Sequence, residues 1–179
     1  MARPRYRDRL PRVPPGRRGG ALAIDFALIW LLSSFAGPFW QVPTYIGLWI
    51  TVRILWVFRN QGQSLGRWAL DMKVVDERYG RVPTLLALTR REAMIGLCTL
   101  LLVISLNNLI TPNGVPNGAV LLAVVPLLGD MGLAFGDVQK RQAFHDRIAG
   151  TIVVQTRRGY SLDLKLRRLV VQFRQRVRR

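Results

Sequence analysis

Apolar residues gather in four stretches separated by polar segments, instead of recurring at the spacing of a soluble core. A helix of about 17 to 20 residues is just long enough to cross a hydrocarbon layer about 30 Å thick. We therefore predict four transmembrane helices, at Gly19–Ala36, Gln41–Phe58, Ala93–Ile110 and Asn117–Gly136. Gly37 and Pro38 should break the chain at the short Gly37–Trp40 connection, so the first two helices are expected to form an antiparallel hairpin.

A polar segment, Gln61–Pro83, follows the second apolar stretch. Within it Met72–Asp76 has a β-like pattern, and Pro83 is expected to open the helix that becomes the third span. Thr151–Gln155 is a second β-like run. The two runs are predicted to pair as a small cytoplasmic ribbon, which needs cover from the helix ends because an isolated two-stranded ribbon is only marginally stable.

Both ends of the chain differ from the middle. Residues 1–16 form a basic Arg/Pro-rich arm, residues 17–155 the four-helix membrane domain, and residues 156–179 a basic extension. Within that extension Ser161–Arg179 has the apolar stripe and basic face of an amphipathic helix that lies on a membrane or on a partner. The predicted lipid or partner contacts are Arg167, Arg168, Phe173 and Arg174.

Charge alternates along the chain. Of 27 Lys and Arg residues, seven lie in residues 1–18, seven in 59–91 and twelve in 140–179, whereas the two other connections carry no charge. Basic loops stay on the cytoplasmic side of a membrane, so this pattern predicts an all-α membrane protein with both termini in the cytoplasm. Four buried helices of a soluble domain is the alternative, and it leaves the asymmetry a coincidence.

The net charge of +17 is also explained by a membrane. The basic residues are divided among three segments without an aromatic-rich basic platform, which argues against nucleic acid as a partner. Anionic lipid head groups attract juxtamembrane Lys and Arg at about 1 kcal/mol each. We therefore expect anionic lipids as partners, together with another membrane protein or further copies of this chain.

Charged residues inside apolar stretches are the first candidates for function. Asp25 and Asp130 lie in the first and fourth predicted spans and Arg53 in the second. A carboxylate near the bilayer centre costs at least about 2.5 kcal/mol on insertion scales and needs a cation, a proton or water. The three residues either form a cation or proton site, or belong to a structural ion network that locks the helices together.

Enzymatic chemistry has little support in the sequence. His145 is the only histidine, and no His, Cys and carboxylate set has the spacing of metal ligands. No nucleophile lies in an elbow motif, and neither phosphate-binding glycine motif occurs. We expect no enzyme, no metal and no cofactor.

Three blocks of the chain resemble the RDD family of small polytopic membrane proteins. They are Arg18-Gly-Gly-Ala-Leu-Ala-Ile-Asp25, Gln61-Gly-Gln-Ser-Leu-Gly-Arg67 followed by Met72–Asp76, and Phe144-His-Asp-Arg-Ile-Ala-Gly-Thr151. Ser64 stands where the family usually has Thr. The resemblance implies that Arg18, Asp25 and Asp146 are the family's name-giving residues, and we expect them to converge in a buried network with Arg147 or Arg67 as a further partner.

The resemblance also implies a bacterial-type integral membrane protein, of an inner (cytoplasmic) or thylakoid-like membrane. Some members of the family are linked to sodium/proton exchange, and a eukaryotic relative to assembly of a membrane ubiquitin-ligase complex. Two hypotheses follow. The first is a non-catalytic accessory, scaffold or assembly subunit of a larger membrane complex. The second is an oligomeric cation/proton transporter that uses Asp25, Asp130 and Arg53.

Overall fold

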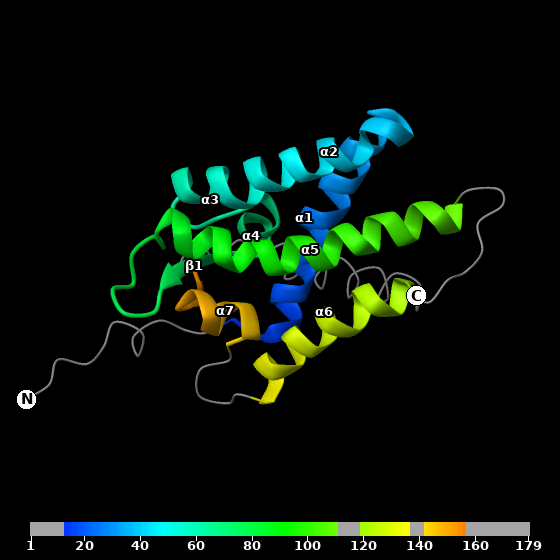
Figure 1. Cartoon of the computed structure of the whole chain (residues 1–179). Helices are drawn as coiled ribbons and strands as arrows, with labels where there is room; N and C mark the ends of the chain where they lie inside the picture. Colours follow the sequence, from blue (N-terminus) through cyan, green and yellow to red (C-terminus); the bar gives the residue numbers. More distant parts are fainter. Residues whose placement is uncertain (1–12, 111–118, 137–141, 157–179) are drawn as a thin grey trace, which may run out of the picture.

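The chain is mostly helical with one small sheet (Figure 1). The computed structural model describes residues 13–110, 119–136 and 142–156. Residues 1–12 of the arm predicted at residues 1–16, and the amphipathic helix predicted at Ser161–Arg179, lie outside these ranges. The elements in chain order are α1 (Pro15–Ser34), α2 (Gly37–Trp49), the π-helical segment η2 (Ile50–Leu55), α3 (Trp56–Arg59), α4 (Leu65–Ala69), β1 (Met72–Asp76), α5 (Leu85–Ile110), α6 (Ala119–Gly136), α7 (Phe144–Ala149) and β2 (Thr151–Gln155).

A tight turn joins α1 to α2, and the two helices form the predicted hairpin. The break comes slightly earlier than the sequence suggests, because α2 already begins at Gly37. Gly37 has φ +79°, a conformation that glycine adopts without strain. Pro38 then occupies the first helical turn, where its missing N–H costs nothing. Downstream, α2, η2 and α3 continue without interruption from Gly37 to Arg59.

The long helix α5 begins two residues later than the Pro83 start that the sequence suggests. Thr84 provides the cap, since its Oγ1 accepts the N–H of Ala87 at 3.3 Å. Among the described residues, two helical segments are long and apolar enough to cross a membrane, Gly37–Arg59 and Leu85–Leu109. Both carry large apolar side chains on their outer faces, including Ile46, Ile50, Leu55, Leu97 and Leu101.

The two β-like runs pair as predicted, with the predicted bounds. Strands β1 and β2 are antiparallel, and Val74 stands opposite Val153 at the centre of the register. One face of this ribbon joins a buried apolar cluster with α1 and the end of α4. The cluster consists of Val13, Ala21, Leu70, Met72, Val74 and Val153. Helix ends therefore provide the cover that a two-stranded ribbon needs.

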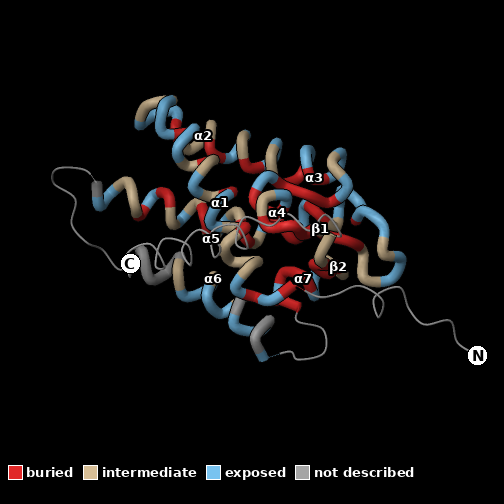
Figure 2. The backbone as a smooth tube through the Cα atoms, turned by 180° about the vertical axis from the view of Figure 1, so that it is seen from behind, coloured by how far each residue is buried: buried red, intermediate tan, exposed pale blue. Residues whose placement is uncertain are grey.

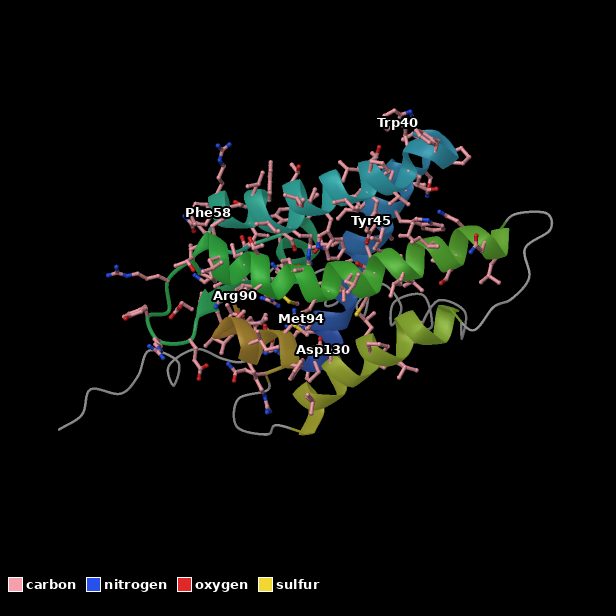
Figure 3. All side chains as sticks on the ribbon, in the orientation of Figure 1. Trp40, Tyr45, Phe58, Arg90, Met94 and Asp130 are labelled. Atoms are coloured by element: carbon pink, nitrogen blue, oxygen red, sulfur yellow. The ribbon has the colours of Figure 1, made fainter. Side chains whose placement is uncertain are left out.

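A second buried cluster holds the long helices together. Ile29 of α1, Tyr45 and Trp49 of α2, and Ile95 and Val103 of α5 form its core. Tyr45 lies between α2 and α5 in Figure 3, stacked on Trp49 with ring centroids 5.8 Å apart. Aromatic pairs in this geometry add about 0.5–1.5 kcal/mol beyond the area they bury.

The ribbon and the short helices lie at one end of the long helices. Figure 1 shows α3, β1 and α7 near the beginning of α5, and the start of α2 near its far end. In Figure 2 the buried backbone is concentrated at β1, β2 and α7, whereas exposed positions follow the outer faces of α2, α5 and α6. The charged residues of interest all belong to the end that holds the ribbon.

Candidate functional site

Asp25 is fully buried in α1 and receives three hydrogen bonds. Its Oδ2 accepts Arg53 Nη1 at 2.5 Å and Ser64 Oγ at 2.6 Å, and its Oδ1 accepts the backbone N–H of Gly66 at 2.7 Å. A buried carboxylate is tolerated only when it is paired and hydrogen-bonded. The donors come from η2 and α4, so this one side chain fixes both elements against α1.

Glu92 is the second fully buried carboxylate, and it lies on α5. Its Oε2 accepts Arg53 Nε at 2.9 Å, and its Oε1 accepts Arg67 Nη2 at 2.7 Å. Arg53 thus bridges Glu92 and Asp25, on helices distant in the sequence. Trp49 completes the contact: its ring lies 5.2 Å from the Arg53 guanidinium carbon, and its Nε1 donates to the Glu92 carbonyl oxygen at 3.2 Å.

The helix is locally π-helical where it carries Arg53. Segment η2 covers Ile50–Leu55, between the α-helical turns of α2 and α3. π-helical turns are rare and frequently mark functional positions. Here the irregular segment holds Arg53, whose side chain joins two buried carboxylates.

The segment from Gly62 to Arg67 is shaped to reach the network. Gly62 has φ +86°, and its carbonyl oxygen accepts the N–H of Val74 at 2.9 Å, which attaches the turn to β1. Ser64 caps α4, since its Oγ accepts the N–H of Arg67 at 3.3 Å. The same hydroxyl donates to Asp25, so the cap and the carboxylate contact are made by one side chain.

Asp146 of α7 is the third buried carboxylate. Its Oδ2 accepts Arg18 Nη1 at 3.2 Å, and its Oδ1 lies 3.2 Å from Arg91 Nη2 and accepts Thr151 Oγ1 at 3.3 Å. Burial raises the pKa of Asp146, but the positive charges of Arg91 and Arg18, joined by that of His145 when the ring is protonated, outweigh it and leave the pKa below its usual range. Asp146 therefore stays ionised at neutral pH and joins α1, α5 and β2 to α7.

His145 connects α7 to α6. Its backbone N–H donates to Asp130 Oδ1 at 2.9 Å, and its Nδ1 lies 2.5 Å from Asp130 Oδ2. Its Nε2 lies 3.3 Å from Arg91 Nη2 and 3.4 Å from Asp146 Oδ1. Figure 3 shows Asp130 on α6, close to α7 and α5. The imidazole thus stands between a carboxylate on one side and a guanidinium–carboxylate pair on the other.

Arg67 is buried close to two other positive charges, those of Arg53 and Arg91. Burial lowers its pKa to about 9, assisted by the positive charges of Arg53 and Arg91 and opposed by Glu92 and Asp25. It remains a cation at neutral pH. Its ion pair with Glu92 is therefore what retains it in the interior.

The sequence predicts one network that contains Arg18, Asp25 and Asp146. The structure divides these residues between two linked halves of the network. Arg18 pairs with Asp146, while Asp25 pairs with Arg53. The physical reason is direction: helical side chains tilt toward the helix N-terminus, so Arg18 extends away from Asp25. It reaches toward the ribbon, where its Nη2 also donates to the Val153 carbonyl oxygen at 3.3 Å.

The other residues singled out from the sequence are distributed as follows. Asp130 pairs with His145 and Asp25 with Arg53, so the two carboxylates of the transporter hypothesis have different partners. Arg67 pairs with Glu92, whereas Arg147 is exposed on α7. The predicted lipid or partner contacts lie outside the described residues; they are Arg167, Arg168, Phe173 and Arg174.

Sequence reasoning missed Arg91 and Glu92. Both precede the third predicted span, which begins at Ala93, yet their side chains are buried. A signal was present in the spacing of Leu88, Glu92 and Ile95, which share the inward face of α5. Within the described part of the chain, no group of three or more His, Cys, Asp or Glu side chains could hold a metal ion.

Removing the charge of Glu92 should destabilise the fold. Glu92→Gln leaves Arg53 and Arg67 buried with one carboxylate fewer, so the free energy of unfolding should fall by about 3–5 kcal/mol. Denaturant titration in a mild detergent measures this. Arg90→Gln is the matched control, because Arg90 is exposed on the same helix and should change stability by less than about 0.5 kcal/mol. Equal losses in both variants would contradict the network.

Gly66 should tolerate no side chain. A Cβ at this position overlaps the Ala21 carbonyl oxygen and lies 3.1 Å from Asp25 Cγ, so Gly66→Ala should cost about 1–3 kcal/mol. Gly47→Ala is the control, since nothing lies within 4 Å of a Cβ there and alanine is the better helix former. Thermal unfolding of the two variants should give opposite shifts; a Gly66→Ala protein as stable as Gly47→Ala would argue against close packing of α4 on α1.

Acid should weaken the Asp146 contacts. A carboxyl whose native pKa is depressed contributes fully above its ordinary value of 3.8, and the contribution is lost as pH falls through the lower native pKa. Asp146→Asn should therefore be less stable than the wild type at neutral pH and lose less stability on acidification. Denaturant titrations from neutral pH downward check this, and difference curves independent of pH would refute it.

One of the comparisons with known proteins gives a match. The model of the RDD family matches residues 12–150, which contain every charged residue of the network described above. Neither the curated proteins nor the solved structures yielded a match. Together with two apolar helices long enough to span a bilayer, the family match supports a membrane protein. The chain belongs to the RDD family.

Proposed function

We propose that this chain is a non-catalytic integral membrane accessory, scaffold or assembly subunit of a larger membrane protein complex. One observation carries the proposal: Asp25, Glu92 and Asp146, the fully buried carboxylates of the described chain, are each paired with arginine. A cation carrier needs carboxylate oxygens that water and the ion can reach. Side chains committed to guanidinium groups favour a rigid subunit instead.

The proposed topology has four spans with both termini in the cytoplasm. Helices α1 and α6 are the two spans added to Gly37–Arg59 and Leu85–Leu109. The end that holds α4, α7 and the ribbon would then face the cytoplasm, in agreement with the basic residues of the polar segments. We place the protein in a bacterial-type inner or thylakoid-like membrane.

The basic extensions support an accessory role, because a carrier has no need of them. Residues 1–16 and 156–179 are rich in arginine and flank the membrane domain. Anionic lipids or an acidic face of a partner would attract them. We propose the partner to be another membrane protein or further copies of this chain.

One observation favours the second candidate, an oligomeric cation/proton transporter. Asp130 is paired with a histidine instead of an arginine, and its side chain is 14% exposed. Histidine changes charge near neutral pH more readily than any other side chain, so a His–Asp pair can take up and release a proton. Asp130 with His145 is therefore the place where a transport mechanism would act.

Purification from the native membrane tests the first candidate. The full-length protein and a variant lacking residues 161–179 are extracted in a mild detergent and compared by quantitative mass spectrometry. We expect the wild type to retain at least one membrane protein in a fixed ratio, and the truncated protein to retain less of it. The same preparation in proteoliposomes should give no sodium- or pH-driven flux above empty liposomes.

The contrary result is equally definite. A wild-type protein that purifies without any partner and drives flux, with Asp130→Asn abolishing the flux but not the folding, would replace the accessory role by transport. Arg90→Gln is again the control, because it removes an exposed charge outside the network.

A further inference from the structure

A small cavity lies inside the network. It has a volume of about 40 Å³ and is bounded by residues of α1, η2, α4, α5, α6, α7 and the ribbon. Its charged lining consists of Arg18, Arg53, Arg67, Arg91, Asp130, His145 and Asp146, and apolar side chains such as Leu22 and Ile95 form much of the remaining wall. Arginine therefore dominates the polar part of the wall.

Two of these arginines have hydrogen-bond donors that the protein does not use. Arg67 Nη1 and Arg91 Nη1 are buried, and neither finds an acceptor among the described residues. The two residues are 3% and 4% exposed, so bulk water does not solvate them. A buried donor without an acceptor is unfavourable, and one on a charged group is especially so. The cavity that both side chains line is where an acceptor can sit.

The size of the cavity limits what it can hold. A buried water needs about 10–15 Å³ of cavity volume. The 40 Å³ of this cavity therefore accommodates a few water-sized molecules or ions and no large group. A phosphate or sulfate with its four oxygens is too large, whereas a halide ion with a water fits. Guanidinium groups only donate hydrogen bonds, which favours an anion over a neutral water as their acceptor.

We propose that this cavity is a binding site for a small monovalent anion of halide size, held by Arg67 and Arg91. The site is independent of the proposed accessory role, because it would complete the network equally in a subunit or in a carrier.

Charge balance connects the anion to His145. The guanidinium groups of Arg18, Arg53, Arg67 and Arg91 are matched by four carboxylates, those of Asp25, Glu92, Asp130 and Asp146, so an added anion leaves one negative charge in excess. A proton on the imidazole restores neutrality. Anion binding should therefore be accompanied by proton uptake.

The geometry around the ring fits this exchange. The groups that face His145 are Asp130 from α6, Arg91 from α5 and Asp146 on its own helix, and β2 contributes no titratable side chain. With Nε2 unprotonated the ring accepts from Arg91 Nη2, and with Nε2 protonated it donates to Asp146 Oδ1. Protonation thus releases one more Arg91 donor at the moment the anion arrives.

The experiment uses the full-length protein in a mild detergent. Sodium gluconate is replaced by sodium bromide at constant ionic strength, and the thermal unfolding midpoint is recorded at about pH 6. We expect a saturable rise in Tm, of about 5–10 °C at a hundredfold excess over the half-saturating concentration. Chloride should act similarly and sulfate should not. A linear or absent response would mean that the cavity holds only water, and would overturn the proposal.

Variants locate the effect. Arg91→Lys and Arg67→Lys should raise the half-saturating bromide concentration at least about tenfold, which corresponds to one lost charge-assisted hydrogen bond. Arg90→Lys, exposed on the same helix, should leave it unchanged. If the lysine variants do not fold, anomalous diffraction from wild-type crystals grown in bromide decides: a peak between Arg67 and Arg91 is expected, and its absence refutes the site.

The proton coupling has its own readout. In the wild type the half-saturating bromide concentration should rise as pH is raised, because an unprotonated ring no longer balances the anion. His145→Gln should remove this dependence and still bind bromide. The same pH dependence in both proteins would eliminate His145 from the site.

Discussion

Arg53 cannot leave the interior without taking the paired cation from Asp25 and one of the paired cations from Glu92, and this constraint organises the membrane domain. Its guanidinium group bonds Asp25 on α1 and Glu92 on α5 at once, from a π-helical segment on a third helix. Buried ions are strongly unfavourable when one partner is missing, yet a complete set is seldom more stable than apolar packing. The network therefore specifies which helix faces meet more than it adds stability.

The structure of the end that holds the ribbon follows from that requirement. The turn at Gly62 and the cap at Ser64 bring the Ser64 hydroxyl and the Gly66 backbone N–H to Asp25. Because Gly66 has no side chain, α4 can approach α1 closely. On the other side, α7 brings Asp146 to Arg91. The β1–β2 ribbon joins the two halves, since its strands directly follow α4 and α7.

Local structure was largely predictable, because it depends on neighbours in the sequence. The hairpin at Gly37, the two strands and their pairing follow from turn residues and alternating patterns. The choice of ionic partners was not predictable. A sequence gives the position of a charged residue along a helix, but it does not give the direction in which the side chain points around the helix axis. Arg18 illustrates this: it shares a helix face with Asp25 and yet pairs with Asp146. Glu92 was missed because it lies at the border between the polar first turns of α5 and the apolar part of the same helix.

Function is most constrained by the one place where the network departs from arginine–carboxylate pairing. Elsewhere in the described network each carboxylate is paired with a guanidinium group. His145 faces Asp130 with one nitrogen and the Arg91–Asp146 pair with the other, and its charge can change. In an accessory subunit, a titratable contact between α6 and α7 would let the packing of these two helices respond to pH. In a carrier, the same contact would be the place where a proton is transferred.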